Sequence, residues 1–210
     1  PGHELEEEGD TGIIGGTAAN SGDYPFYVKF EGSVLCGGSM IAPDTILTAA
    51  HCVDGKEGPP PQVRVGATSY NGGRLANVAC SISHPSFRES STTLVNDVAI
   101  IKLTSPVEGI SSIPDGIIPI NKDTSYPSAS GTPLTVIGFG LTSNEGSVSS
   151  TLRQVTTSFV TANDCIGTYG GDVVFTDKHI CADIKDAGDC NGGTFKEIAS
   201  SFSETDICTS

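Results

Sequence analysis

Residues 47–52 and 96–101, which read LTAAHC and NDVAII, decide the fold of this chain. The first stretch is an apolar run that ends in a histidine and a cysteine. The second places an aspartate at the mouth of a near-continuous apolar run, which is typical of a strand buried on both faces. A histidine acts as a general base when a carboxylate fixes its tautomer and stabilises its imidazolium form. His51 and Asp97, 46 residues apart, are therefore candidates for one such pair.

The rest of the pattern is that of an all-β protein. Apolar and polar residues alternate with a period of two at 27–30, 62–65 and 134–137, as they do in half-buried strands. The 26 glycines and 12 prolines favour many short strands and turns over long helices. Residues 105–133 contain several prolines and little periodicity, which indicates a linker between two halves of the 210-residue chain.

Composition excludes several kinds of partner. The formal net charge of −14 argues against nucleic acid and against an anionic membrane surface, because both attract basic patches. The apolar stretches are too short to span a bilayer. Residues 1–12 are acidic and lack apolar periodicity, so we expect a disordered tail. No signal peptide is visible and the chain does not begin with Met, which is expected if a signal has been removed or the sequence is a fragment.

Three stretches in this order carry a resemblance to a known family. Residues 13–16 read IIGG, followed by LTAAHC and NDVAII, and together they resemble the trypsin/chymotrypsin family of secreted serine proteases. Residues 13–18 and 152–165 look most like the trypsin-type members of fungi and similar microbes. The resemblance implies two antiparallel six-stranded barrels, at about 13–115 and 116–210, the second one incomplete. It also implies a secreted monomer without a cofactor. We expect no metal ion, because the sequence shows no cluster of metal ligands.

The resemblance assigns roles to His51, Asp97 and Ile13. The first two stand at the catalytic histidine and aspartate positions, and Ile13 stands where the family's new amino terminus arises after removal of a propeptide. Gly12 precedes it, although zymogens activated by trypsin carry Arg or Lys there. The acidic residues 1–12 would then be the pro-segment.

The third part of the catalytic triad departs from the family. Where the family has Gly-Asp-Ser-Gly-Gly-Pro, residues 192–196 read GGTFK. This alignment places Thr194 at the serine position and Gly192 at the oxyanion hole. Gly193 replaces the aspartate that would receive the ammonium group of Ile13. A threonine carries a hydroxyl group, but its extra methyl is stiff about χ1 and crowds the attack geometry.

A second alignment puts a cysteine at the nucleophile position. Residues 188–190 read GDC, and a Cys190 thiolate would attack as in the chymotrypsin-like viral proteases. The separation of nine residues from Cys181 instead matches two successive disulfide cysteines of the family, with Cys208 as the partner of Cys190. The specificity pocket would have Gly188 at its base, or Asp189 if the register slips by one residue.

The seven cysteines suggest an oxidising compartment. Cys36 and Cys52, like Cys165 and Cys181, are 16 residues apart, which suggests two local disulfides. We expect Cys80 to be an unbonded residue of the core. No Cys-x-x-Cys pair indicates a zinc or redox motif.

Two functions follow from these observations. The first is a secreted serine-protease homologue, broken at Thr194, that acts by binding a peptide or protein. The second is an active endopeptidase that uses Thr194, Cys190 or a sequence variant with serine restored. The chain stops two residues after Cys208, where the family continues with a strand and a helix. Altered splicing, a frame change or an imperfect gene model would explain this departure, and so would a selected pseudoenzyme.

Overall fold

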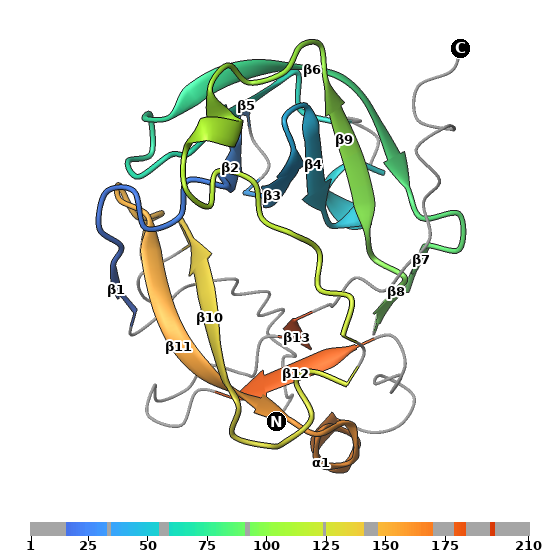
Figure 1. Ribbon diagram of the computed structural model, residues 1–210. Helices are drawn as coiled ribbons and strands as arrows, with labels where there is room; N and C mark the ends of the chain where they lie inside the picture. Colours follow the sequence, from blue (N-terminus) through green and yellow to red (C-terminus); the bar gives the residue numbers. More distant parts are fainter. Residues whose placement is uncertain are drawn as a thin grey trace, which may run out of the picture.

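The first half of the chain forms a closed barrel of six antiparallel strands (Figure 1). The computed structural model describes residues 16–32, 35–54, 59–90, 93–123, 125–140, 147–169, 179–183 and 194–195. Around the barrel the strands follow the order β2-β3-β4-β9-β6-β5. Their bounds are Tyr27–Phe30 (β2), Gly37–Ala42 (β3), Thr45–Thr48 (β4), Gln62–Val65 (β5), Arg74–Ser83 (β6) and Ala99–Leu103 (β9).

The predicted apolar patterns produce the core of this barrel. In β4 and β5 every second residue is buried, so each strand turns one face inward. In β9 four of the five residues are buried, as its continuous apolar sequence predicts. Each large apolar side chain that is fully buried contributes roughly 1.5–3 kcal/mol. The fully buried residues of the barrel core include Val28, Met40, Ile46, Val63 and Ile101.

The second half contributes a five-stranded sheet. Its central strand β11 (Arg153–Val160) pairs with β10 (Pro133–Gly138), β12 (Ile180–Asp183) and β1 (Thr17–Ala18), and β12 pairs with β13 (Thr194–Phe195). Over the described residues this sheet is open. The predicted all-β architecture is confirmed, and the open sheet formed by the described residues is consistent with the predicted incomplete second barrel. Within the described ranges this half also contains one α-helix, α1 (Ala162–Tyr169).

Shorter elements complete the fold. They are the two-stranded ladder of β7 (Arg88–Glu89) and β8 (Leu94–Val95), and the 3₁₀ turns η1 (Ala50–Cys52) and η2 (Ile110–Ser112). None of the helices in the described ranges has the length and apolar character needed to cross a membrane.

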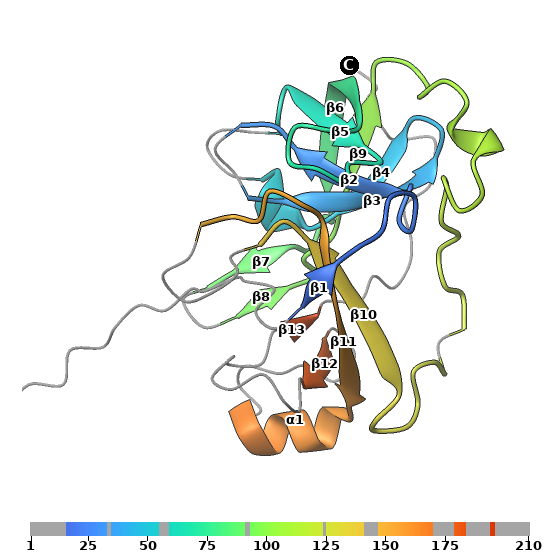
Figure 2. The same ribbon diagram turned by 90° about the vertical axis from the view of Figure 1, so that its left-hand side faces the viewer.

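An aromatic cluster joins the two sheets. Figure 2 shows β1, from the start of the chain, lying beside β10 and β11 below the closed barrel. Phe139, which follows β10, packs against the rings of Tyr27 and Tyr70 at centroid distances of 5.8 and 5.7 Å. Leu152 is fully buried in the same cluster. Burial raises the pKa of Tyr27 to about 12, so its phenol is neutral here.

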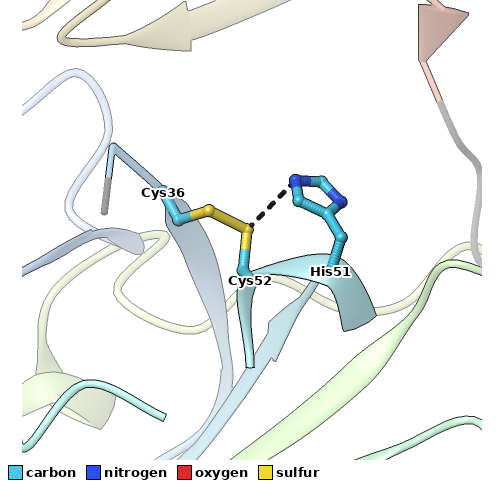
Figure 3. A group of neighbouring side chains, drawn as sticks. All are labelled: Cys36, His51 and Cys52. Carbon is cyan, nitrogen blue, oxygen red and sulfur yellow. Dashed lines mark hydrogen bonds between the residues drawn. A yellow bond between two sulfur atoms is a disulfide. The ribbon is translucent and has the colours of Figure 1, made fainter. Parts of the chain in front are cut away.

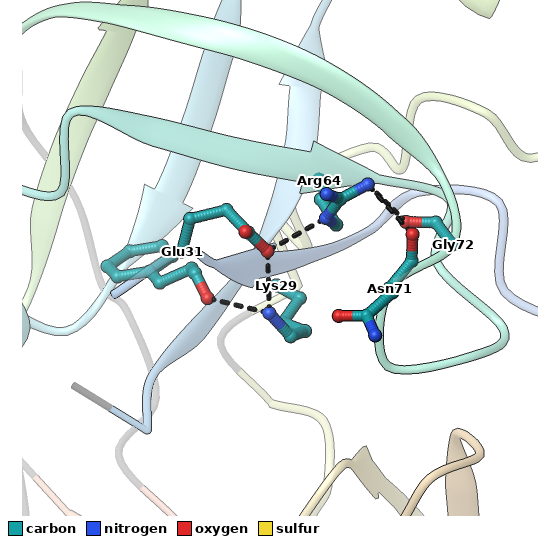
Figure 4. A network of polar contacts seen from close by, with 6 residues as sticks. Lys29, Glu31, Arg64, Asn71 and Gly72 are labelled. Atoms are coloured by element: carbon teal, nitrogen blue, oxygen red, sulfur yellow. Dashed lines mark hydrogen bonds and ion pairs between the residues drawn. The ribbon is translucent and has the colours of Figure 1, made fainter. Parts of the chain in front are cut away.

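Three charged side chains form a network on the barrel beside this cluster (Figure 4). Glu31 Oε1 accepts hydrogen bonds from Lys29 Nζ at 2.7 Å and from Arg64 Nε at 2.8 Å. Lys29 is 6% exposed, and its ammonium lies 4.2 Å from the centroid of the Tyr70 ring. Arg64 also donates to the carbonyl of Asn71 at 2.8 Å. The hydrogen bond from Lys29, supported by the one from Arg64, lowers the pKa of Glu31.

We predict that this network makes stability depend on pH. Folding lowers the pKa of Glu31, so its ionised carboxylate stabilises the folded chain. This stabilisation is complete above the unfolded pKa of 4.5 and is lost as pH falls through the lower folded pKa. Glu31→Gln should therefore lower the melting temperature at pH 7, and the difference from the unsubstituted chain should shrink in acid. Thermal unfolding between pH 3 and pH 7 measures this. Glu89→Gln, at an exposed position, is the control, and an unchanged difference at all pH values would contradict the prediction.

Candidate active site

His51 lies on the turn η1, which begins just after β4 ends at Thr48. The turn is held from two sides, because Ala50 is fully buried in the barrel core and Cys52 is bonded to Cys36. Of the three residues in η1, the histidine alone is exposed. The local sequence therefore presents one imidazole on a rigid support at the end of the barrel.

A close approach of β3 to β4 strengthens this support. The hydroxyl of Thr48 donates to the carbonyl of Gly37 at 2.7 Å. A Cβ atom at Gly38 would lie 2.6 Å from the carbonyl oxygen of Leu47, so this position has room for glycine alone. The strands β3 and β4, which adjoin Cys36 and the turn that carries His51, are therefore held in one register.

Asp97 approaches the histidine from the other side, just before β9. Its side chain is fully buried, and both carboxylate oxygens contact His51. Oδ1 accepts from the backbone N–H of His51 at 2.8 Å, and Oδ2 lies 2.7 Å from the ring Nδ1. An ionised carboxylate only accepts hydrogen bonds, so Nδ1 carries the proton and Nε2 carries the lone pair. The structure thus joins the two predicted residues in the arrangement that a general base requires.

The segment before Asp97 is held by a turn at residues 84–87. Asn96 has φ = 54°, a left-handed conformation that asparagine tolerates better than most residues. Its side-chain amide donates to the carbonyl of Ser86 at 2.9 Å, and the N–H of His84 donates to the carbonyl of Val98 at 2.8 Å. The turn at 84–87 therefore helps to position the carboxylate of Asp97.

His179 ties the second sheet to the same segment. The sequence indicated no partner for it, but the residue is 8% exposed and its Nε2 lies 2.7 Å from the carbonyl oxygen of Leu94. A carbonyl only accepts, so Nε2–H is the donor. Leu94 lies in β8, three residues before Asp97, and sequence periodicity carries no signal for a contact across 85 residues.

We predict that His179→Ala lowers the free energy of unfolding by about 1–3 kcal/mol, because a buried hydrogen bond between the sheets is lost. His179→Gln keeps an N–H donor on a side chain of similar reach and should recover part of the loss. Urea denaturation of the three proteins measures the effect. Equal losses for Ala and Gln would assign the cost to packing and would contradict the hydrogen-bond explanation.

The remaining predicted site residues are placed only in part. The backbone of Thr194 lies in β13, where it pairs with Cys181 of β12. The other residues predicted from the resemblance lie outside the described residues, and their roles, like that of Thr194, stay predictions. These are Ile13, Gly188, Asp189, Cys190, Gly192, Gly193 and Cys208.

Two predicted disulfides are confirmed, and one expectation is wrong. Cys36 is bonded to Cys52 and Cys165 to Cys181, with Cα atoms 6.1 and 6.2 Å apart. Cys80 is also disulfide-bonded rather than unbonded. It lies in β6 where the register with β9 shifts, and its partner lies outside the described residues. Cys190 and Cys208 lie outside the described residues, and a bond between them stays a prediction.

His51 and the two neighbouring cysteines form a potential metal-binding group (Figure 3). The ligand atoms of Cys36, His51 and Cys52 all lie within 4.8 Å of one another. It is the one such group of three or more residues within the described ranges. While the two sulfur atoms are bonded to each other, they are not available as thiolate ligands.

The fold and the site together define a class. A closed six-stranded barrel, a second antiparallel sheet, and a buried aspartate paired with an exposed histidine at the barrel end are the features of a chymotrypsin-like protein. The family model described as Trypsin matches residues 13–194. This chain therefore belongs to the Trypsin family, as the three sequence stretches predicted.

Known relatives agree with this membership. The chain is 32% identical over 188 residues to Trypsin alpha of Drosophila melanogaster and 34% identical over 187 residues to Trypsin alpha-4 of Lucilia cuprina, in each case over 87% of this chain and 71% of the relative. It is 28% identical over 196 residues to the fibrinolytic enzyme, isozyme C, of Lumbricus rubellus, over 86% of this chain and 78% of the relative. These relatives come from insects and an earthworm, and the fungal-type assignment stays a prediction.

Proposed function

We propose that this chain is a secreted member of the Trypsin family that keeps the histidine and aspartate of the triad, lacks its serine, and acts by binding a peptide or protein. The observation that carries the proposal is the contrast between two parts of one site. The His51–Asp97 pair is formed, with Nδ1 and Oδ2 2.7 Å apart, whereas residues 192–196 read GGTFK in place of the family's serine motif.

The chemistry of Thr194 supports this contrast. Threonine nucleophiles work mainly where the amino terminus of the chain is the base, whereas here the base would be a histidine. The glycine at position 193 also offers no carboxylate to an ammonium group at Ile13. Both the nucleophile and the group that shapes the oxyanion hole would therefore be impaired.

Membership of a protease family implies that peptide or protein chains are the substrates or binding partners. The charge of −14 supports a partner that is neither nucleic acid nor an anionic membrane. Two disulfides between described residues support passage through an oxidising compartment, and hence secretion. We further propose that residues 1–12 are removed at Gly12–Ile13, as in a zymogen, and that the domain works as a monomer.

A second candidate function is an active endopeptidase. The observation that favours it is the intact tautomer of His51, whose Nε2 lone pair is free of the Asp97 contact and suited to accept a proton. Cys190 or Thr194 would then be the nucleophile, with Gly192 at the oxyanion hole and Gly188 or Asp189 in the specificity pocket.

We predict that the chain cleaved at Gly12–Ile13 hydrolyses peptides roughly 10⁴-fold or more slowly than an active trypsin, because loss of a triad member removes most of the rate. Thr194→Ser alone should not restore normal turnover, since the members of the site act as one unit. The measurement is kcat/KM on a broad peptide panel, together with labelling by a fluorophosphonate probe. His51→Ala should leave the residual rate unchanged.

The opposite results would establish the enzyme. Turnover that His51→Ala abolishes, or probe labelling mapped to Thr194 by mass spectrometry, would overturn the proposal. Alkylation of Cys190 that abolishes turnover would assign the nucleophile to that cysteine. Sequencing the transcript across residues 192–196 decides whether the threonine is present in the expressed protein.

A further inference from the structure

We propose that reduction of the Cys36–Cys52 disulfide creates, together with His51, a three-ligand site for a thiophilic divalent cation such as Zn²⁺. The site goes beyond the proposed function, because it depends on the local geometry of η1 and not on whether the chain cleaves peptides. It would be a metal site that exists only in the reduced protein.

The distances around the histidine suit tetrahedral coordination. His51 Nε2 lies 3.4 Å from the sulfur of Cys52 (Figure 3). Zinc bonds of about 2.3 Å to sulfur and 2.0–2.1 Å to nitrogen give a ligand-to-ligand edge of about 3.5 Å. The nitrogen and this sulfur therefore already stand at the spacing that one zinc ion requires.

The second sulfur requires only a local movement. Two thiolates on one tetrahedral zinc ion lie about 3.8 Å apart, given bonds of 2.3 Å. The Cα atoms of Cys36 and Cys52 are 6.1 Å apart, so side-chain rotation can provide this spacing without moving the strands. The supporting backbone is held by the hydrogen bond from Thr48 to Gly37 and by the buried Ala50.

Asp97 completes the arrangement from behind the imidazole. Ligating histidines usually donate their other ring N–H to a carboxylate, which fixes the tautomer and raises ligand basicity. Here Oδ2 of Asp97 accepts from Nδ1 at 2.7 Å, and Oδ1 accepts from the backbone of the same residue at 2.8 Å. Nε2, which carries the lone pair in this tautomer, already lies 3.4 Å from the sulfur of Cys52.

The donor set points to a zinc-like ion. Two thiolates and one imidazole suit Zn²⁺, Cd²⁺ or Co²⁺, whereas Mg²⁺ and Ca²⁺ prefer oxygen ligands. Three protein ligands leave the fourth position open for water.

The chemical steps balance with a thiol reductant. Two reductant thiols break the Cys36–Cys52 bond, become a disulfide themselves, and leave two protein thiols. Binding of the cation then forms two metal–sulfur bonds and one metal–nitrogen bond and releases two thiol protons to water. Because the metal occupies the Nε2 lone pair, His51 can no longer accept a proton while the ion is bound.

The chain contains a matched comparison. Cys165 and Cys181 are also 16 residues apart, with Cα atoms 6.2 Å apart. No third ligand accompanies them among the described residues, in contrast to the group at His51. Reduction should therefore release two thiols at each of these two disulfides, but it should create a three-ligand site only at Cys36–Cys52.

The experiment uses the full chain, reduced by a water-soluble phosphine, desalted without oxygen and titrated with Co²⁺. We expect one ion to bind with the visible absorption of a tetrahedral thiolate site, and the oxidised chain to show none. The Cys36→Ser/Cys52→Ser variant should lose this signal, and the Cys165→Ser/Cys181→Ser variant should keep it. Asp97→Asn should weaken binding roughly 10- to 100-fold, and His51→Ala at least as much.

Alkylation of the reduced wild-type chain tests the site without any variant. Zn²⁺ should protect Cys36 and Cys52 and leave Cys165 and Cys181 reactive, as read by peptide mass spectrometry. Equal protection of both pairs would overturn the proposal, and so would Co²⁺ binding that survives Cys36→Ser/Cys52→Ser or is unaffected by His51→Ala. A reduced chain that circular dichroism shows to be unfolded, and that Zn²⁺ does not refold, would overturn it as well.

Discussion

The double contact between Asp97 and His51 is the constraint on which the site depends. A carboxylate that is fully buried must be compensated by hydrogen bonds, since an unpaired buried charge is strongly destabilising. Both of its oxygens find their partner in one residue, the ring through Oδ2 and the backbone through Oδ1. This fixes the place of the histidine, its tautomer and the direction of its lone pair together.

The barrel makes that contact possible through strand register. Thr48 at the end of β4 pairs with Ala99 at the start of β9. Since the strands are antiparallel, the chain leaves β4 toward His51 at the same barrel edge where it enters β9 from Asp97. A slip of one residue would turn the alternating side chains of β4 to the wrong face, so the buried apolar pattern protects the geometry of the site.

The sequence predicted those features that leave a pattern in neighbouring or recognisable residues. The alternating strands, the buried β9 and the histidine–aspartate pair follow from periodicity and from recognisable stretches, and the two disulfides were suggested by equal spacing. The sequence did not reveal the bond at Cys80, the contact of His179 with Leu94, or the pairing of Thr17 with Gln154. The last two contacts join segments that are distant along the chain, and local periodicity carries no signal for such long-range pairing.

The geometry also explains why family membership and activity are separate questions here. The Asp97–His51 pair is held by the first barrel and by the hydrogen bond from His179 to Leu94, and neither of these two described contacts includes Thr194. A chain can therefore lose the serine and keep the pair, because the pair also satisfies a buried charge. The imidazole of His51 is 44% exposed, and the one lone pair of its neutral form can accept a proton or bind a metal ion, but not both at once. The groups placed next to Nε2 then decide its chemistry, and in the described part of the site the group in contact is the sulfur of Cys52.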